Sequence, residues 1–180
     1  MPLGYGSQVW PDQWLPGIRL RLLDQDPGLS KDRVFMSMQG MEFHLKWPVA
    51  DQFITLFTPD FPVDQNMVTG GGNLNTAFDS TLETTLYCRV ESDVEGRSTQ
   101  QLEEYAIGVY RFTLRVLAAL QDWQGPTADD GRQMFRRPMR IRPGFRIERK
   151  AGQDKMRWAV IPISWECSFV SDLGNNWPGG

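Results

Sequence analysis

Cysteine and histidine are scarce in this chain, which has two cysteines and one histidine in 180 residues. Protein metal sites draw most of their ligands from clusters of such side chains. Cys88 and Cys167 lie far apart and form no CxxC motif, and His44 has no second histidine to join it. We therefore expect no metal and no cofactor. The cysteines are expected to be buried thiols in a reducing compartment, with a disulfide as the alternative.

Long apolar runs are also missing. No segment approaches the ~20 apolar residues that a membrane-spanning helix needs, so a membrane is not an expected partner. Met1–Trp10 has neither the basic start nor the apolar stretch of a secretory signal. We expect the chain to remain in the cytoplasm in which it is made, unless it leaves as part of a particle.

Positive charge is not in excess. The chain has 19 Lys and Arg against 22 Asp and Glu, which gives a formal net charge of −3. A protein built to grip nucleic acid phosphates needs a basic surface, so the overall charge does not favour that class. Hydrophobic residues make up 41% of the chain, enough for one folded domain with a core.

Catalytic constellations are absent as well. His44 could act as a general base, but the sequence pattern does not identify a nucleophile or second acid near it. We expect a surface or strand histidine. Asp129 and Asp130 are expected to be solvated, with a divalent-metal hydrolase as the remote alternative. Gly70–Gly72 lacks the following Lys-Ser or Lys-Thr of a phosphate-binding loop. The sequence therefore predicts that the protein is not an enzyme.

The organisation along the chain predicts a single domain with two extensions. We assign 1–16 to an N-terminal arm, 17–173 to one α+β domain with a long loop at 60–79, and 174–180 to a C-terminal tail. The arm contains Trp10 and Trp14 and is too rich in Pro and Gly for a helix. It is expected either to cover the chain's own core or to lie on a neighbouring subunit.

Ser98–Trp123 has the pattern of one long amphipathic helix. Ser98 is a good N-cap, and Gln101 stands at the position that completes a capping box. Apolar residues recur at spacings of three and four from Leu102 to Trp123, which predicts a single apolar stripe. Gly125-Pro126 is the predicted stop.

The remaining patterned segments predict strands. Thr81–Val90 alternates in the way typical of a sheet with one covered face. Pro162, inside the last strand, indicates an edge or bulged position. The other expected elements are a short N-terminal helix or strand at Gly17–Asp24, strands at Asp32–Met38 and Gln52–Thr58, and a long C-terminal hairpin of Met139–Glu148 and Lys155–Val170. The predicted fold class is α+β, a mainly antiparallel sheet of about four or five strands packed on one long helix plus a short N-terminal helix.

Arginine is concentrated between Arg132 and Arg149, with Phe135 and Phe145 interleaved. Basic and aromatic residues together are typical of single-stranded nucleic acid binding, which is one interpretation. Charge pairing across a subunit interface is the second, because arginine pairs carboxylates bidentately, and solvated arginine is the third. The candidate interface residues are Arg137, Arg140, Arg142, Arg146, Pro162, Trp10 and Trp14.

The order of elements from Thr81 to Leu173 resembles the tail terminator, or tail-completion, proteins and related neck proteins of tailed bacteriophages. The resemblance is carried by the strand Leu82–Val90, the helix ending in Val116-Leu-Ala-Ala-Leu-Gln-Asp-Trp123, the strand Met139–Glu148 and the closing strand Trp158–Phe169. It implies a structural virion protein that forms a ring, usually a hexamer, at the head-proximal end of the tail. Its implied partners are further copies of itself, the tail tube protein and the head–tail connector or neck proteins, with DNA passing through the lumen. Another connector, neck or baseplate adaptor is the alternative, and a nucleic-acid-binding module a further one.

Overall fold

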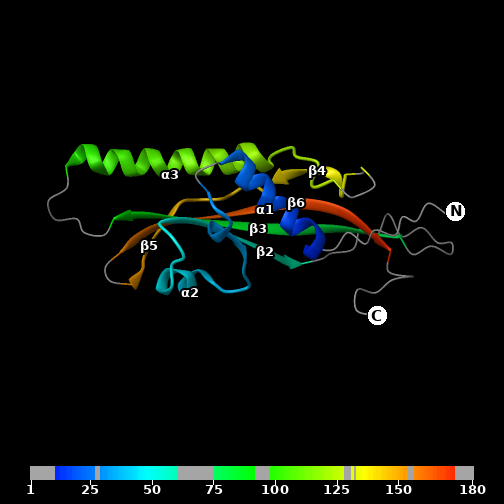
Figure 1. The fold of residues 1–180 in the computed structure, drawn as a ribbon, viewed down its shortest axis with the longest axis horizontal. Helices are drawn as coiled ribbons and strands as arrows, with labels where there is room; N and C mark the ends of the chain where they lie inside the picture. The colour runs from blue at the N-terminus through cyan, green and yellow to red at the C-terminus, as the bar shows by residue number, and fades with distance from the viewer. Residues whose placement is uncertain are drawn as a thin grey trace.

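The computed structural model describes residues 11–26, 29–60, 75–91, 98–127, 131, 133–153 and 156–172. In chain order the elements are α1 (Pro11–Gln25), η1 (Lys31–Arg33), β1 (Val34–Met36), α2 (Met41–Lys46), β2 (Gln52–Asp60), β3 (Asn75–Glu91), α3 (Thr99–Leu120), β4 (Phe135–Ile141), β5 (Glu148–Ala151) and β6 (Arg157–Asp172). Figure 1 shows α3 running in the direction of the two longest strands, β3 and β6, beside part of their length. The predicted α+β class is confirmed.

A single sheet of six strands forms the body of the molecule, with the order β1-β2-β3-β6-β4 and with β5 also paired to β6. All pairs are antiparallel except β1 with β2. β3 and β6 pair from Asn75↔Asp172 to Glu91↔Arg157. This long two-stranded ladder is the axis to which the other elements are attached.

The long helix begins where the sequence predicts. The Ser98 side chain accepts a hydrogen bond from the Gln101 N–H, and the Gln101 side chain accepts one from the Ser98 N–H, so the capping box is present. The helix ends at Leu120, before the predicted stop, because Asp122 takes a positive φ of 59° and its N–H bonds to the Met139 carbonyl. The predicted apolar stripe is buried only in part, since residues 98–107 are exposed.

The predicted extended conformation of residues 11–16 is wrong, because they form the first turns of α1. Trp14 is fully buried and meets Phe135 edge-on, with 5.4 Å between the ring centroids. Pro16 removes only the one helix bond to the residue-12 carbonyl. Gly17 allows close contact with Pro126, whose Cγ lies 2.3 Å from where a Cβ would be. The residues that looked like helix breakers are therefore compatible with a helix that buries a tryptophan.

The predicted loop 60–79 is too long at both ends. β2 continues to Asp60, where the side chain accepts a hydrogen bond from the Thr81 N–H at 2.9 Å, and β3 already begins at Asn75. Residues 61–74, with Gly70–Gly72, lie outside the described residues, as do 1–10 of the predicted arm and the predicted tail 174–180.

The C-terminal hairpin is present, but its first strand is divided. β4 and β5 both pair with β6, and the predicted strand Met139–Glu148 is interrupted by Pro143 and by Gly144, which has a φ of 104°. Of the two positions predicted for Pro162, edge or bulged, the edge is wrong, because β6 lies between β3 and the β4/β5 pair. On the β4/β5 side, no ladder pair falls between Val160 and Trp165, so the missing N–H of Pro162 faces the interruption.

The sheet is covered on both faces at one end. The main core lies between the sheet and the helices α1 and α3, whereas a second cluster of Leu45, Phe53, Tyr87, Trp158 and Val160 lies on the other face, under α2. The prediction of one covered face for Thr81–Val90 therefore fails at Tyr87, which is 1% exposed.

Trp165 tests the main core. Its side chain is fully buried, and its Nε1–H donates to the Thr84 hydroxyl at 2.9 Å. Trp165→Ala should lower the free energy of unfolding by about 3–5 kcal/mol. Thr84→Val, which leaves the indole N–H unpaired, should cost about 1–3 kcal/mol. Urea denaturation followed by circular dichroism measures both, and losses no larger than that of the exposed control Tyr110→Ala would contradict this account of the core.

Gly125 and Gly131 form a matched pair for testing close packing. Both have positive φ, 81° and 82°, but a Cβ on Gly125 would lie 2.4 Å from the Phe135 ring, whereas one on Gly131 meets nothing within 4 Å. The backbone penalty of alanine, about 1–2 kcal/mol, is shared. Gly125→Ala should therefore lower the melting temperature clearly more than Gly131→Ala. Equal shifts would show that the Phe135 ring can move aside at no cost in stability.

Candidate functional site

The candidate interface arginines lie on β4 and on the segment that follows it. Arg137 pairs with Ser168 and Arg140 with Glu166 in the β4–β6 ladder. Residues three apart in a regular strand point to opposite faces. The register shifts on both sides of Arg137, so the strand is irregular there, and Arg137 and Arg140 both match β6 residues on the face away from α1 and α3. The Arg142 N–H donates to the Ser164 carbonyl at 2.8 Å, which extends the same register.

These arginines differ in how firmly they are paired. Arg140 is 3.9 Å from Asp122, and Arg142 is 3.8 Å from Glu166, both long distances for an ion pair. Arg137 is exposed and has no ion-pair partner among the described residues. Their even spacing predicts one strand face for Arg140, Arg142 and Arg146. This holds for Arg140 and Arg142, and the register shift brings Arg137 to the same face.

Arg146 belongs to a separate group. Its Nε–H donates to Glu148 at 2.9 Å, and Lys150 Nζ also lies 2.9 Å from the same carboxylate. Hydrogen bonds from Lys150 and Arg146 lower the pKa of Glu148. Arg146 is therefore occupied within the chain, on the far side of the Pro143-Gly144 interruption.

A depression of about 480 Å³ lies beside the β4 arginines. It is lined by Asp79, Ser80, Arg137, Pro138, Arg140, Arg142, Glu166, Cys167 and Ser168. We call this the arginine pocket. Ser168 is 6% exposed, and its hydroxyl is buried with no hydrogen-bond partner among the described residues. The alternation of β6 places Glu166 and Ser168 on the outward face, but only the pairing register shows that they lie beside the arginines.

The other candidate interface residues are not brought to this pocket. Pro162 is half-buried in the interior strand β6, and Trp14 is buried in the main core, so neither is an exposed anchor in this chain. Of the two alternatives predicted for the arm, Trp14 follows the first, because it covers the core of its own chain. Trp10 lies outside the described residues.

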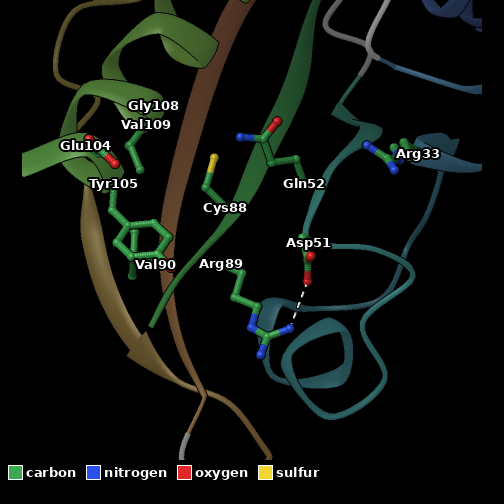
Figure 2. A pocket seen from close by; sticks show the side chains of 10 residues that line it. All are labelled: Arg33, Asp51, Gln52, Cys88, Arg89, Val90, Glu104, Tyr105, Gly108 and Val109. Carbon is green, nitrogen blue, oxygen red and sulfur yellow. Dashed lines mark hydrogen bonds and ion pairs between the residues drawn. The ribbon is translucent and has the colours of Figure 1, made fainter. Parts of the chain in front are cut away.

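A second open site lies under the N-terminal half of α3 (Figure 2). This pocket of about 400 Å³ is lined by residues of α3, β3, β2 and η1, among them Glu104, Tyr105, Cys88, Gln52 and Arg33. A groove of about 240 Å³ on the other flank of the helix shares Tyr105 with it. The exposed start of α3 therefore has open space on both sides.

Exposed apolar side chains gather at the opposite edge of the sheet. Met36 of β1 is 46% exposed, and Met38, just beyond it, is 84% exposed. The neighbouring α2 adds Phe43, and Trp47 follows, at 46% and 66%. The 2.9 Å contact between the Ser37 hydroxyl and His44 Nε2 ties the end of β1 to α2. Exposed apolar groups of this kind are typical of binding surfaces.

Neither cysteine is an activated nucleophile. Burial raises the pKa of Cys88 to about 12 and also raises the pKa of Cys167, so both thiols stay protonated. No three described His, Cys, Asp or Glu residues form a group that could hold a metal ion. Asp129 and Asp130 lie outside the described residues. No described helix combines the length and the apolar character that crossing a membrane requires.

The expected surface or strand position of His44 is wrong. His44 lies in α2, is 2% exposed and is surrounded by the rings of Phe35, Phe43, Phe53 and Tyr87. Burial lowers its pKa, and a hydrogen bond to the Gln39 backbone opposes this. Its contacts make His44 a packing residue that holds α2 against the sheet.

Comparisons with known proteins give little further information. No protein-family model matches this chain, and neither does any curated protein. A solved structure described as the virion of a native gene transfer agent particle is similar to it, with a TM-score of 0.36 and 9% identity over 86% of this chain and 97% of that one. Similarity at this level carries no argument about function. Membership of the tail terminator family therefore stays a prediction.

His44 makes stability depend on pH. The unfolded chain binds a proton near the ordinary value of 6.5, whereas folded His44 stays neutral to lower pH. Below that value the unfolded state binds more protons, so stability should fall as pH falls from 6.5 towards the folded pKa. The His44→Gln variant lacks this titration. We therefore expect its urea midpoint to rise relative to that of the original chain as pH drops from 7 to 5. A difference that stays constant over this range would show that His44 does not titrate differently in the two states.

Proposed function

We propose that this chain is a structural virion protein that forms a ring, with six copies expected, at the head-proximal end of a phage tail. There it would end the tail tube, join it to the head connector and let DNA pass. The order of elements β3, α3, β4, β5, β6 supports the proposal, because it corresponds to the block that resembles tail terminators, with the third segment of that block divided between β4 and β5.

The observation that carries the proposal is that the two edges of the sheet differ. The β4 edge has loosely paired arginines, whereas the β1 edge has the exposed Met36 and Met38. In a ring, each copy offers one surface to one neighbour and a different surface to the other, so a subunit needs two unlike complementary surfaces. A self-complementary dimer would need only one.

Under this proposal the protein binds other virion proteins and catalyses no reaction. The thiols are protonated, His44 is used in packing, and Arg146 and Lys150 are occupied by Glu148. Passage of DNA is compatible with a formal net charge of −3, because a strongly basic lumen would hold the phosphates. Localisation in the virion follows from the same proposal.

A different position in the particle would use the same surfaces. Another head–tail connector, neck protein or baseplate adaptor also needs a ring with unlike faces. The place of the protein in an electron micrograph of the particle distinguishes these roles from that of a tail terminator.

The proposal predicts a defined mass and an effect on tube length. Native mass spectrometry or sedimentation of the purified chain, alone and with its tail tubes, should give a closed ring or tubes capped at one end. Tubes assembled with the protein should have a narrower length distribution than tubes assembled without it. A chain that stays monomeric and joins neither tubes nor necks would exclude this function.

A further inference from the structure

We propose that the arginine pocket binds a carboxylate side chain of a second copy of this chain, supplied from the β1 side of that copy by Asp32 or Glu42. This inference rests on the proposed ring and names the contact that would hold it together. The pocket and its ligand would make β4 of one copy the neighbour of β1 of the next.

The irregularities of β4 build the pocket. The register shifts between Phe135 and Arg137, and again between Arg137 and Arg140. Bulges re-aim side chains and are typical of functional positions in strands. Here they bring Arg137 and Arg140 to one face of the sheet while Phe135 and Met139 remain in the main core. Two guanidinium groups are thus presented at an edge without loss of core packing.

The guanidinium groups are not fully used by the chain's own carboxylates. The nearest partners of Arg140 and Arg142 lie at 3.9 Å and 3.8 Å, and Arg137 has none among the described residues. Arginine binds a carboxylate most strongly when two N–H groups donate in parallel at shorter distances. The pocket therefore has unused capacity for an oxyanion.

The Ser168 hydroxyl is a second, independent sign of a missing ligand. It is buried, lacks a hydrogen-bond partner among the described residues, and lies directly across the ladder from Arg137. Buried hydroxyls are almost always paired in folded proteins. An oxyanion held by Arg137 would come next to this hydroxyl and could accept its proton in a hydrogen bond.

The charge of the pocket favours one carboxylate over nucleic acid. The lining of the pocket holds three guanidinium groups and the two carboxylates of Asp79 and Glu166, a surplus of one positive charge, and the Asp122 carboxylate lies 3.9 Å from Arg140. A DNA strand brings a series of phosphates, and the two acids beside the arginines would repel those next to the bound one. The formal net charge of −3 adds no overall attraction for phosphates.

The β1 side supplies the complementary groups. Asp32 in η1 and Glu42 in α2 are exposed, and neither has an ion-pair partner among the described residues. They flank the exposed Met36 and Met38 along the chain, so an apolar contact with charged neighbours is available there. The sheet order places this side opposite to β4, which is the arrangement that a closed ring needs.

Assembly of single variants is the first test. Arg137→Gln should raise the concentration at which half of the rings dissociate by on the order of tenfold. Arg111→Gln on α3, also an exposed arginine, is the matched control and should leave this concentration unchanged. Ser168→Ala should weaken assembly in the same direction as Arg137→Gln. Thermal unfolding at a concentration below assembly should be the same for Arg137→Gln, Arg111→Gln and the original chain.

Charge reversal identifies the ligand. Arg137→Glu should abolish assembly, and combining it in the same chain with Asp32→Arg or Glu42→Arg should restore it at least in part. Restoration by neither would overturn the assignment of the carboxylate to the β1 side. Anisotropy of a labelled DNA duplex at low salt is measured in parallel, and DNA binding that Arg137→Gln removes while assembly stays intact would overturn the inference in favour of nucleic acid.

The two proposals fail in different ways. If the original chain forms rings and both Arg137→Gln and Arg137→Glu form them equally well, the pocket inference is wrong and the ring function stands. If the original chain is monomeric alone and with tubes, both proposals are wrong.

Discussion

The ladder between β3 and β6 is the interaction on which the rest of the structure depends. It pairs residues 75–91 with residues 157–172 and brings together two parts of the chain about 80 positions apart. The other elements are built onto this ribbon: β2 pairs with one side and carries β1, β4 and β5 pair with the other side, and the helices pack on the faces of the sheet. Contacts at such sequence separation are slow to form because the entropy cost of closing the chain between them comes first, so we expect this ladder to slow folding.

The helices then divide the sheet into regions with different roles. α1 and the second half of α3 cover one face and are joined by the ion pair of Asp26 with Arg115 at 3.1 Å and by the bond from Arg21 to the Ala119 carbonyl. α2 covers only the end of the other face. The start of α3, the β4 edge and the β1 edge are left to solvent, and the polar and apolar groups available for partners are concentrated there.

The sequence predicted best the elements that local chemistry specifies. The capping box of α3, the alternation of β3 and β6, and the α+β class all follow from neighbouring residues. It failed where tertiary contacts decide the outcome. The Pro and Gly content of residues 1–16 argued against a helix, yet residues 11–16 begin α1, where the buried Trp14 contributes to the core. The burial of His44 and Tyr87 was not predicted, because it depends on the packing of α2 on the second face of the sheet. The arginine pocket could be predicted only as a basic stretch, because register shifts, which leave no local signature, decide that Arg137 and Arg140 share a face.

The division of the sheet's outer edge into β4, of 7 residues, and β5, of 4, limits how the protein can aggregate. A long, regular edge strand can accept the same strand from another molecule without end, and fibres grow in this way. Here the edge is broken at Pro143, its backbone is irregular around Arg137, and its arginines repel an identical edge. These features disfavour extension of the sheet by backbone pairing along this side. Association at this edge through side chains of limited reach favours an assembly of finite size over a fibre.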